Sequence, residues 1–463
     1  MDKILRKIKK LKMKFYLISI LYLFIINAVL AADEVSFTGT WSSSQYNKGE
    51  LPDIDLQGNS LRQIVKVSIP GEQLRFHFSN IYGKEELELK SVHVAKSAGQ
   101  GTGSIILETD TEITFKGQYN VSIPAYGDIV SDIIPFSLSA LDEVAITIQY
   151  GKIPFDFTGH TSSRTYSFVE LGNAVSKETF SSDHKFLHWF TIAAIDVVDN
   201  EKKTEAILCY GDLITDGRGS TNDKQNRWPD VLSERLQSHP ATRHLAILNQ
   251  AIGGSSLYGQ NNPVWPTGLG RYQKDVAEQV NVKYMIVLYG VNDILYSQRT
   301  APVLIEGLQE LIKRNRERGI ITYGSPILPF KSNEGWTEEK NRVKETVNQW
   351  ILNTPASEGG FDAIIDFSSV VADPNDRMVL KADLSDGDGL HPNYLGYAAM
   401  GNSIDLGLFI NDEVENVDEN VDENEDENEN DLIYSDEENI ENDEFFDSEV
   451  TAINEAEDSI DDE

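Results

Sequence analysis

Apolar and polar positions alternate with a period of two along much of the first half of the chain. The alternation is clearest at residues 61–69 and 74–78, and it is typical of strands that bury one face. Further strands are predicted at residues 91–95, 113–115, 144–150 and 186–197. Turn signals such as Pro70-Gly71 separate these runs. Several short strands with regular turns predict an all-β sandwich over residues 33–200.

The rhythm changes in residues 201–410, where apolar runs alternate with helical patterns. The runs lie at 206–210, 245–248, 284–289, 320–323 and 363–367. The helical patterns lie at 228–237, 272–280, 303–318, 338–352 and 393–409. Strands that alternate with helices of this length predict a parallel sheet covered by helices on both faces. After the first run we expect a tight turn, and then a helix that begins near residue 228.

The first 32 residues are predicted to be a secretory signal peptide. Seven Lys and Arg residues at 1–14 precede an apolar run at 15–30, and cleavage is expected after Ala31 or Ala32. The alternative is an uncleaved anchor, but the run is shorter than the roughly 20 residues of a spanning helix. We therefore expect no stable membrane span after cleavage. Secretion makes Asn120, in Asn120-Val121-Ser122, a candidate glycosylation site.

The charge of the chain is concentrated at its C-terminal end. Residues 411–463 hold 26 Asp and Glu and no Lys or Arg, out of a net charge of −35. This acidic Asn/Asp/Glu-rich tail is predicted to be disordered because it repels itself and buries little. The remaining 49 acids and 40 bases argue against nucleic-acid binding. Cys209 is the only cysteine, so no internal disulfide forms, and we expect it to be a small buried hydrophobe.

Polar groups follow the predicted strands at three places and precede the last predicted helix at a fourth. These stretches are Gly211-Asp212-Leu213 and residues 249–255, 290–293 and 388–393. The carboxyl ends of parallel strands face one crevice, so the four stretches are expected to meet in space.

Four residues in these stretches carry candidate chemistry. Asp388 precedes His391 by three residues, with Pro392 suited to the first position of a helix. A carboxylate that accepts a hydrogen bond from imidazole fixes its tautomer, and the other ring nitrogen can then act as a general base. Gly254 offers a backbone N–H and Asn292 a side-chain amide, which together suit an oxyanion. Each residue alone is also explained by turn chemistry, but their occurrence in this order favours a hydrolytic site.

On these residues, the chain resembles the SGNH hydrolases, also called GDSL-type esterases and lipases. Residues 211–217 match the family's first block, Gly-Asp-Ser-x-Thr-Asp-Gly, except at Leu213. Gly254, residues 290–293 and residues 388–391 match the later blocks. The resemblance covers about 205–410. The region before it resembles, more loosely, the β-domain that precedes the catalytic domain in one secreted branch of the family.

The resemblance implies a flavodoxin-like three-layer α/β/α sandwich preceded by the all-β sandwich. It also implies ester hydrolysis through an acyl-enzyme, with no metal or organic cofactor. The family pattern puts Leu213 in the nucleophile position, His391 as base, Asp388 as its partner, and Gly254 and Asn292 in the oxyanion hole. The implied substrate is an acylated small molecule or polysaccharide, since secreted relatives commonly remove acetyl groups from plant polysaccharides.

Leu213 is the departure from the family pattern. Leucine has no atom that attacks a carbonyl or forms an acyl-enzyme. Hydroxyl groups occur nearby at Thr215, Ser255 and Ser256, but their positions do not match that of the nucleophile. Activation of water by His391 remains as a weak route.

Two interpretations follow. The first is a secreted carboxylic-ester hydrolase, such as a polysaccharide acetyl esterase, whose activity is absent or residual, with Leu213 a recent loss or an error in the recorded sequence. The second is a catalytically inactive secreted protein that binds carbohydrate or ester ligands. Trp41 and Trp189 form either a sugar platform or, as we favour, core packing. A scaffold role of the acidic tail is a more distant alternative, and the oligomeric state stays open.

Overall fold

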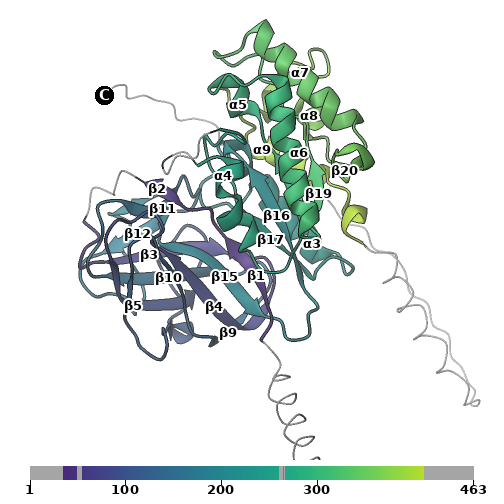
Figure 1. Ribbon diagram of the computed structural model, residues 1–463. Helices are drawn as coiled ribbons and strands as arrows, with labels where there is room; N and C mark the ends of the chain where they lie inside the picture. Colours follow the sequence, from purple (N-terminus) through teal and green to yellow (C-terminus); the bar gives the residue numbers. More distant parts are fainter. Residues whose placement is uncertain (1–34, 49–54, 260–263, 265, 411–463) are drawn as a thin grey trace, which may run out of the picture. The chain divides into compact units, whose positions relative to one another are not determined.

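The computed structural model describes residues 35–48, 55–259, 264 and 266–410 (Figure 1). The predicted signal peptide and acidic tail lie outside the described residues. No helix among the described residues is long and apolar enough to cross a membrane.

Antiparallel sheets form the first half of the described chain. One sheet has the order β1 (Phe37–Ser42), β15 (Ile192–Val198), β4 (Gly71–Ser79) and β8 (Asp128–Val130), with β9 (Ile134–Leu138) also paired to β4. A second has the order β13 (Lys185–Phe186), β12 (Ser167–Glu170), β3 (Ser60–Lys66), β10 (Glu143–Tyr150), β5 (Leu87–Lys96) and β6 (Thr111–Glu112), with β7 (Val121–Ile123) paired to β5. The third has the order β14 (His188–Phe190), β11 (Phe157–Thr161) and β2 (Tyr46–Lys48).

The two larger sheets share one hydrophobic core, which confirms the predicted sandwich. Side chains of β4 and β15, such as Phe76 and Ile195, belong to the same buried cluster as Val92 of β5 and Ile146 of β10. The strand predicted at 113–115 is wrong, because β6 ends at Glu112 and the chain turns back at Phe115, which exchanges backbone hydrogen bonds with Gln118.

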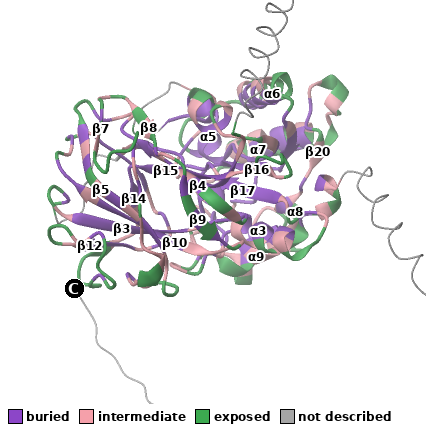
Figure 2. Ribbon diagram, turned by 90° about the horizontal axis from the view of Figure 1, so that it is seen from below, coloured by how far each residue is buried: buried purple, intermediate pink, exposed green. Residues whose placement is uncertain are grey.

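A parallel five-stranded sheet forms the second half. Its order is β17 (Leu245–Asn249), β16 (Glu205–Gly211), β18 (Val282–Leu288), β19 (Ile321–Gly324) and β20 (Ala363–Ile364). The helices are α2 (Leu213–Asp216), α3 (Trp228–Ser238), α4 (Gly268–Tyr272), α5 (Val291–Leu295), α6 (Ala301–Glu317), α7 (Glu338–Asn353), α8 (Phe367–Val371) and α9 (Tyr394–Ser403). Figure 2 places α3, α8 and α9 on one side of this sheet and α5, α6 and α7 on the other. The predicted three-layer α/β/α sandwich is therefore confirmed.

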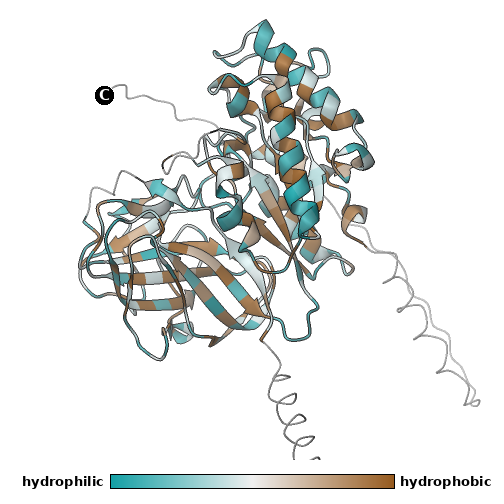
Figure 3. Ribbon diagram, viewed as in Figure 1, coloured by the Kyte–Doolittle hydropathy of each residue, from teal (hydrophilic) through white to brown (hydrophobic). Residues whose placement is uncertain are grey.

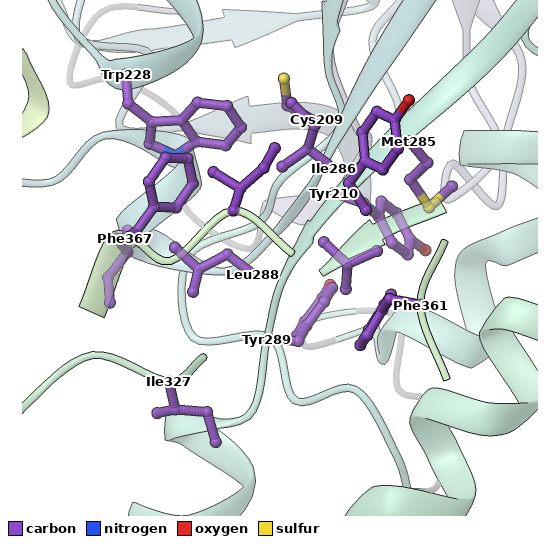
Figure 4. Close-up of a cluster of buried hydrophobic side chains, with 14 of the residues drawn as sticks. Cys209, Tyr210, Trp228, Met285, Ile286, Leu288, Tyr289, Ile327, Phe361 and Phe367 are labelled. Atoms are coloured by element: carbon purple, nitrogen blue, oxygen red, sulfur yellow. The ribbon is translucent and has the colours of Figure 1, made fainter. Parts of the chain in front are cut away.

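The hydrophobic faces of these layers meet in one core. Helix α6 buries Leu304, Leu308 and Leu311 at helical spacing, and its outer face is hydrophilic (Figure 3). On the other side, Trp228 of α3 lies 5.1 Å from Phe367 of α8, measured between ring centroids (Figure 4).

The β-sandwich covers part of the parallel sheet directly, so helices alone do not cover both faces. Ala246 and Leu248 of β17 belong to the hydrophobic core of the sandwich. The Ile247 N–H donates to Ser68 Oγ at 3.1 Å, and Ser43 pairs with Asn249 in a parallel bridge. The two halves are joined through the edge strand that leads into the candidate site. The predicted boundary at 200/201 lies in the connection between β15 and β16.

The helix predicted from residue 228 is confirmed by α3, but two other predicted helices have different bounds. An additional helical turn that was not predicted, α2, begins at Leu213 because Asp212 caps it. The helix predicted at 272–280 begins and ends earlier in the structure, where α4 starts at Gly268 and continues only into a π-helical turn, Gln273–Ala277. Helix α9 begins at Tyr394, because the Asn393 side chain accepts the N–H groups of Leu395 and Gly396. Pro392 therefore precedes the cap, and does not occupy the first helical position.

Candidate active site

Leu213 lies at the carboxyl end of β16, where it opens α2. Asp212 Oδ1 accepts the N–H of Ile214 at 3.1 Å, and this cap turns the chain sharply from strand into helix. The Leu213 side chain is half-buried and packs on the next loop. A methyl group added to Gly253 would lie 2.9 Å from Leu213 Cδ1. An apolar side chain thus occupies the space between α2 and the loop that carries Gly254.

Two buried carboxyl groups support this corner. Burial raises the pKa of Asp212 to about 7, and the neighbouring Asp293 charge adds to the effect. Burial also raises the pKa of Asp293 to about 6. Asp293 accepts the N–H groups of Leu257 at 2.8 Å and Tyr258 at 3.1 Å, which ties the loop after β17 to α5.

Asp388 and His391 form a hydrogen-bonded pair ahead of α9. Asp388 Oδ2 accepts from His391 Nδ1 at 2.5 Å, and its Oδ1 accepts the backbone N–H groups of Leu390 and His391 at 2.9 Å. Burial lowers the pKa of His391, and Asp388 opposes this effect. Partial burial alone would raise the pKa of Asp388, but hydrogen bonds from His391 hold it below its usual value. The ring is thus neutral near pH 7, with no hydrogen-bond partner for Nε2 among the described residues.

The segment that follows Leu213 packs on the His391 turn. A methyl group added to Gly219 would lie 2.3 Å from the Pro392 carbonyl oxygen. Arg218 Nη2 lies 3.6 Å from Asp388 Oδ2. The structure therefore brings the nucleophile position and the Asp388–His391 pair to the same edge of the sheet, as predicted.

The two candidate oxyanion donors follow β17 and β18. Gly254 has a φ of 76°, in the left-handed region that favours glycine. The buried Asn292 amide donates one N–H to the Ser255 carbonyl oxygen at 3.1 Å. The second N–H of the same amide group takes no part in this hydrogen bond. Gly253 donates its N–H to Asp216 Oδ2 at 3.2 Å, so this loop is fixed to α2.

Two of the three other hydroxyl groups near Leu213 are hydrogen-bonded elsewhere, and the third, on Thr215, is buried without a hydrogen-bond partner among the described residues. Ser255 Oγ is buried and bonded to the Pro266 carbonyl oxygen at 2.7 Å, while Ser256 Oγ pairs with Ser297 Oγ at 2.9 Å. Thr215 is fully buried inside α2, and its Oγ1 lies against Gly211. These positions agree with the expectation that none of the three replaces the missing nucleophile.

A buried hydrogen-bonded pair that the sequence analysis did not identify connects the sandwich to this corner. His160, at 3% exposure, lies on β11, with Nε2 at 2.9 Å from Asp216 Oδ1 and Nδ1 at 2.9 Å from the Ser44 carbonyl oxygen. Asp216 thereby joins β11 to the loop that carries Gly254. Asp216 belongs to the first block, but no sequence signal linked it to a histidine 56 residues earlier.

An open depression of about 470 Å³ lies over Leu213. Both halves of the chain line it, with Ser162 and Arg164 from the sandwich and Arg218, Ser220, Asn222 and Asp386 from the α/β half. Trp41 and Trp189 are buried and pack edge to face at 5.1 Å. The alternative in which they form a sugar platform is therefore wrong.

Two further predictions concern exposure. Cys209 is fully buried in β16 and burial raises the pKa of its thiol, as expected of a small hydrophobe. Asn120 is exposed just before β7, so its glycosylation stays a prediction. Within the described part of the chain, no group of three or more His, Cys, Asp or Glu side chains is placed to hold a metal ion.

Comparison with known proteins supplies the family. Residues 209–399 match the model of the GDSL-like Lipase/Acylhydrolase family, and no curated protein matches the chain. A lipolytic protein of the G-D-S-L family from Desulfitobacterium hafniense DCB-2 is 19% identical, with a TM-score of 0.34 over 43% of this chain and 97% of that one. A GDSL-like lipase from Bacteroides thetaiotaomicron is 16% identical, with a TM-score of 0.34 over 45% and 89%. An acetyl xylan esterase is 18% identical, with a TM-score of 0.33 over 43% and 96%. By the match to the family model, residues 209–399 are a domain of the GDSL-like lipase/acylhydrolase family.

Proposed function

We propose that this chain binds acyl esters at the Leu213 corner and does not hydrolyse them through an acyl-enzyme. The observation that carries this proposal is Leu213 itself. It follows the Asp212 cap at the end of β16 and packs on Gly253. An ester carbonyl placed there meets a hydrocarbon side chain instead of a nucleophile.

The remaining groups define what the site does chemically. The Gly254 N–H and the Asn292 amide are suited to hold the carbonyl oxygen of the ester. His391 Nε2 accepts a proton, and Asp388 stabilises the resulting imidazolium. No protein atom forms a bond to the acyl carbon, so attack by a water molecule that His391 activates is the only remaining route to hydrolysis. Loss of the nucleophile in serine hydrolases lowers turnover by about a million-fold.

The second candidate is an acylhydrolase that acts on carboxylic esters, with acetylated polysaccharide as its substrate class. The Asp388–His391 pair, hydrogen-bonded at 2.5 Å, supports this candidate. The polar lining of the depression supports a sugar as the ligand, because Ser162, Asn222 and Asp386 offer partners for hydroxyl groups. The basic and apolar residues at the N-terminus support export of the chain. The mass of the protein recovered outside the cell tests whether residues 1–32 are removed.

The experiment compares hydrolysis of p-nitrophenyl acetate by the natural protein, Leu213→Ser and the double variant Leu213→Ser/His391→Ala. We expect turnover by Leu213→Ser alone. Activity of Leu213→Ser that disappears with His391→Ala assigns the base and leaves the natural protein as a binder. Natural protein that is as active as Leu213→Ser would refute the proposal and require another nucleophile. If the natural protein and Leu213→Ser are both inactive, the placement of the site is refuted.

A further inference from the structure

Arg164 is a charged side chain without a charged partner beside the nucleophile position. It lies on the loop between β11 and β12 and lines the depression over Leu213. The residue is half-buried, and its Nε is buried without a hydrogen-bond partner. Among the residues that the structure describes, none forms an ion pair with its guanidinium. Burial of an unpaired charged donor is unfavourable, which makes Arg164 a candidate for binding a ligand.

A second unpartnered group lines the same depression. Ser220 is 9% exposed, and its Oγ has no hydrogen-bond partner. Arg218 adds a further positive charge, although it is partly committed to Asp388 at 3.6 Å. The exposed Asp386 carries the opposite charge in the same lining. The depression therefore combines one unpaired cation, one shared cation and a free hydroxyl group with one carboxylate.

The loop that carries Arg164 is held in place from both halves of the chain. Ser162 and Arg164 have φ values of 58° and 56°, in the left-handed region that side chains disfavour. The Asp223 N–H donates to the Arg164 carbonyl oxygen at 2.8 Å, and Asp223 Oδ1 accepts the Tyr166 N–H at 2.8 Å. Ser163 donates its N–H to the Leu187 carbonyl oxygen at 3.0 Å. The backbone that carries the Arg164 side chain is thus fixed before any ligand arrives, which reduces the entropy lost on binding.

We propose that Arg164, with Ser220 and Arg218, forms an anion subsite that selects ester ligands carrying a carboxylate, sulfate or phosphate group next to the ester. A guanidinium binds such oxygens through paired hydrogen bonds. An acylated acidic sugar has this combination of ester and charge. This inference rests on the proposed ester site, and it adds the β-sandwich as the part that determines specificity.

The test uses ligands that differ only in the group at C6 of the sugar, which is neutral in one and anionic in the other two. Binding of acetylated glucose, acetylated glucuronic acid and acetylated glucose 6-sulfate to the natural protein is measured by calorimetry. We expect the two anionic ligands to bind about tenfold or more tightly than the neutral one. Their ratio distinguishes a carboxylate from a sulfate subsite. Equal affinities for all three ligands would overturn the proposal.

Four variants locate the effect. Arg164→Gln is expected to abolish the preference and leave acetylated glucose unchanged, whereas Arg164→Lys retains part of it. Asp386→Asn is expected to strengthen anion binding. Arg342→Gln, which removes an exposed charge from α7, is the control and changes nothing. A preference that survives Arg164→Gln in a protein with the natural melting temperature would also overturn the proposal.

The same ligands separate this inference from the ester site. In the Leu213→Ser background, kcat/KM is measured for the three acetates. Activity without preference refutes the anion subsite alone. Absence of activity on every acetate, together with absence of binding, refutes the ester site on which it rests.

Discussion

The Asp212 cap gives the protein a stability that falls as pH rises. Burial raises the pKa of Asp212 to about 7 from an ordinary 3.8. The folded state therefore keeps this proton through a pH range in which the unfolded chain has lost it. Stability linked to Asp212 is greatest at low pH and declines as pH rises towards 7. Integrated over the two pKa values, the loss between about pH 4.5 and about pH 8 is about 3 kcal/mol.

Asp212→Asn isolates this effect, because an amide oxygen still accepts the Ile214 N–H. The free energy of unfolding in urea is measured for the natural protein and the variant at both pH values. We expect the variant to gain about 3 kcal/mol more over the natural protein at about pH 8 than at about pH 4.5. Asp132→Asn is a control of opposite sign, because hydrogen bonds from Gly117 and Thr114 lower the pKa of Asp132. A difference under about 1 kcal/mol between the two pH values would show that Asp212 is not held protonated.

Two further predictions test the contacts of α2, at Leu213 and at Asp216. Gly253→Ala is expected to destabilise the natural protein by about 1–3 kcal/mol, because the new methyl group meets Leu213. The effect should nearly vanish in the Leu213→Ser background, and equal effects in both would place Leu213 elsewhere. His160→Ala leaves Asp216 buried without its partner, and a loss of about 3–5 kcal/mol in unfolding free energy is expected. The exposed His184→Ala is its control, and a loss no larger than that of the control would contradict a stabilising contact between His160 and Asp216.

The parallel sheet was predictable because its strands are buried on both faces and appear in the sequence as continuous apolar runs. The rule that site residues follow such strands then brought Leu213 and Asn292 to one edge. Local competition explains the errors. The run at 363–367 contains only a two-residue strand, β20. The Asp366 side chain caps the start of α8, which begins at the last residue of the run.

The contribution of the β-sandwich to the site was not predictable from these patterns. His160 lies on β11 and contacts Asp216. Arg164 lies on the loop that follows β11 and lines the depression. Only the tertiary structure brings these residues to the site. Alternation of hydrophobic residues identifies the sandwich strands, but it gives no sign of which loop faces the α/β half. Trp41 and Trp189 are different, because core packing was the favoured interpretation of both residues and both rings are buried.

The intact Asp388–His391 pair does not by itself indicate catalysis. Asp388 Oδ1 accepts two backbone N–H groups at 2.9 Å, so the carboxylate also builds the turn ahead of α9. His391 is buried within that turn, and without it Asp388 would lose the hydrogen bond from Nδ1. The pair therefore has a structural reason to persist whether or not an acyl-enzyme forms. The turn into α2 does not need a nucleophilic side chain at position 213, because the cap on α2 comes from Asp212. The chemistry of the site is thus decided at residue 213, and the response of Leu213→Ser to His391→Ala distinguishes a catalytic base from a residue that only closes a turn.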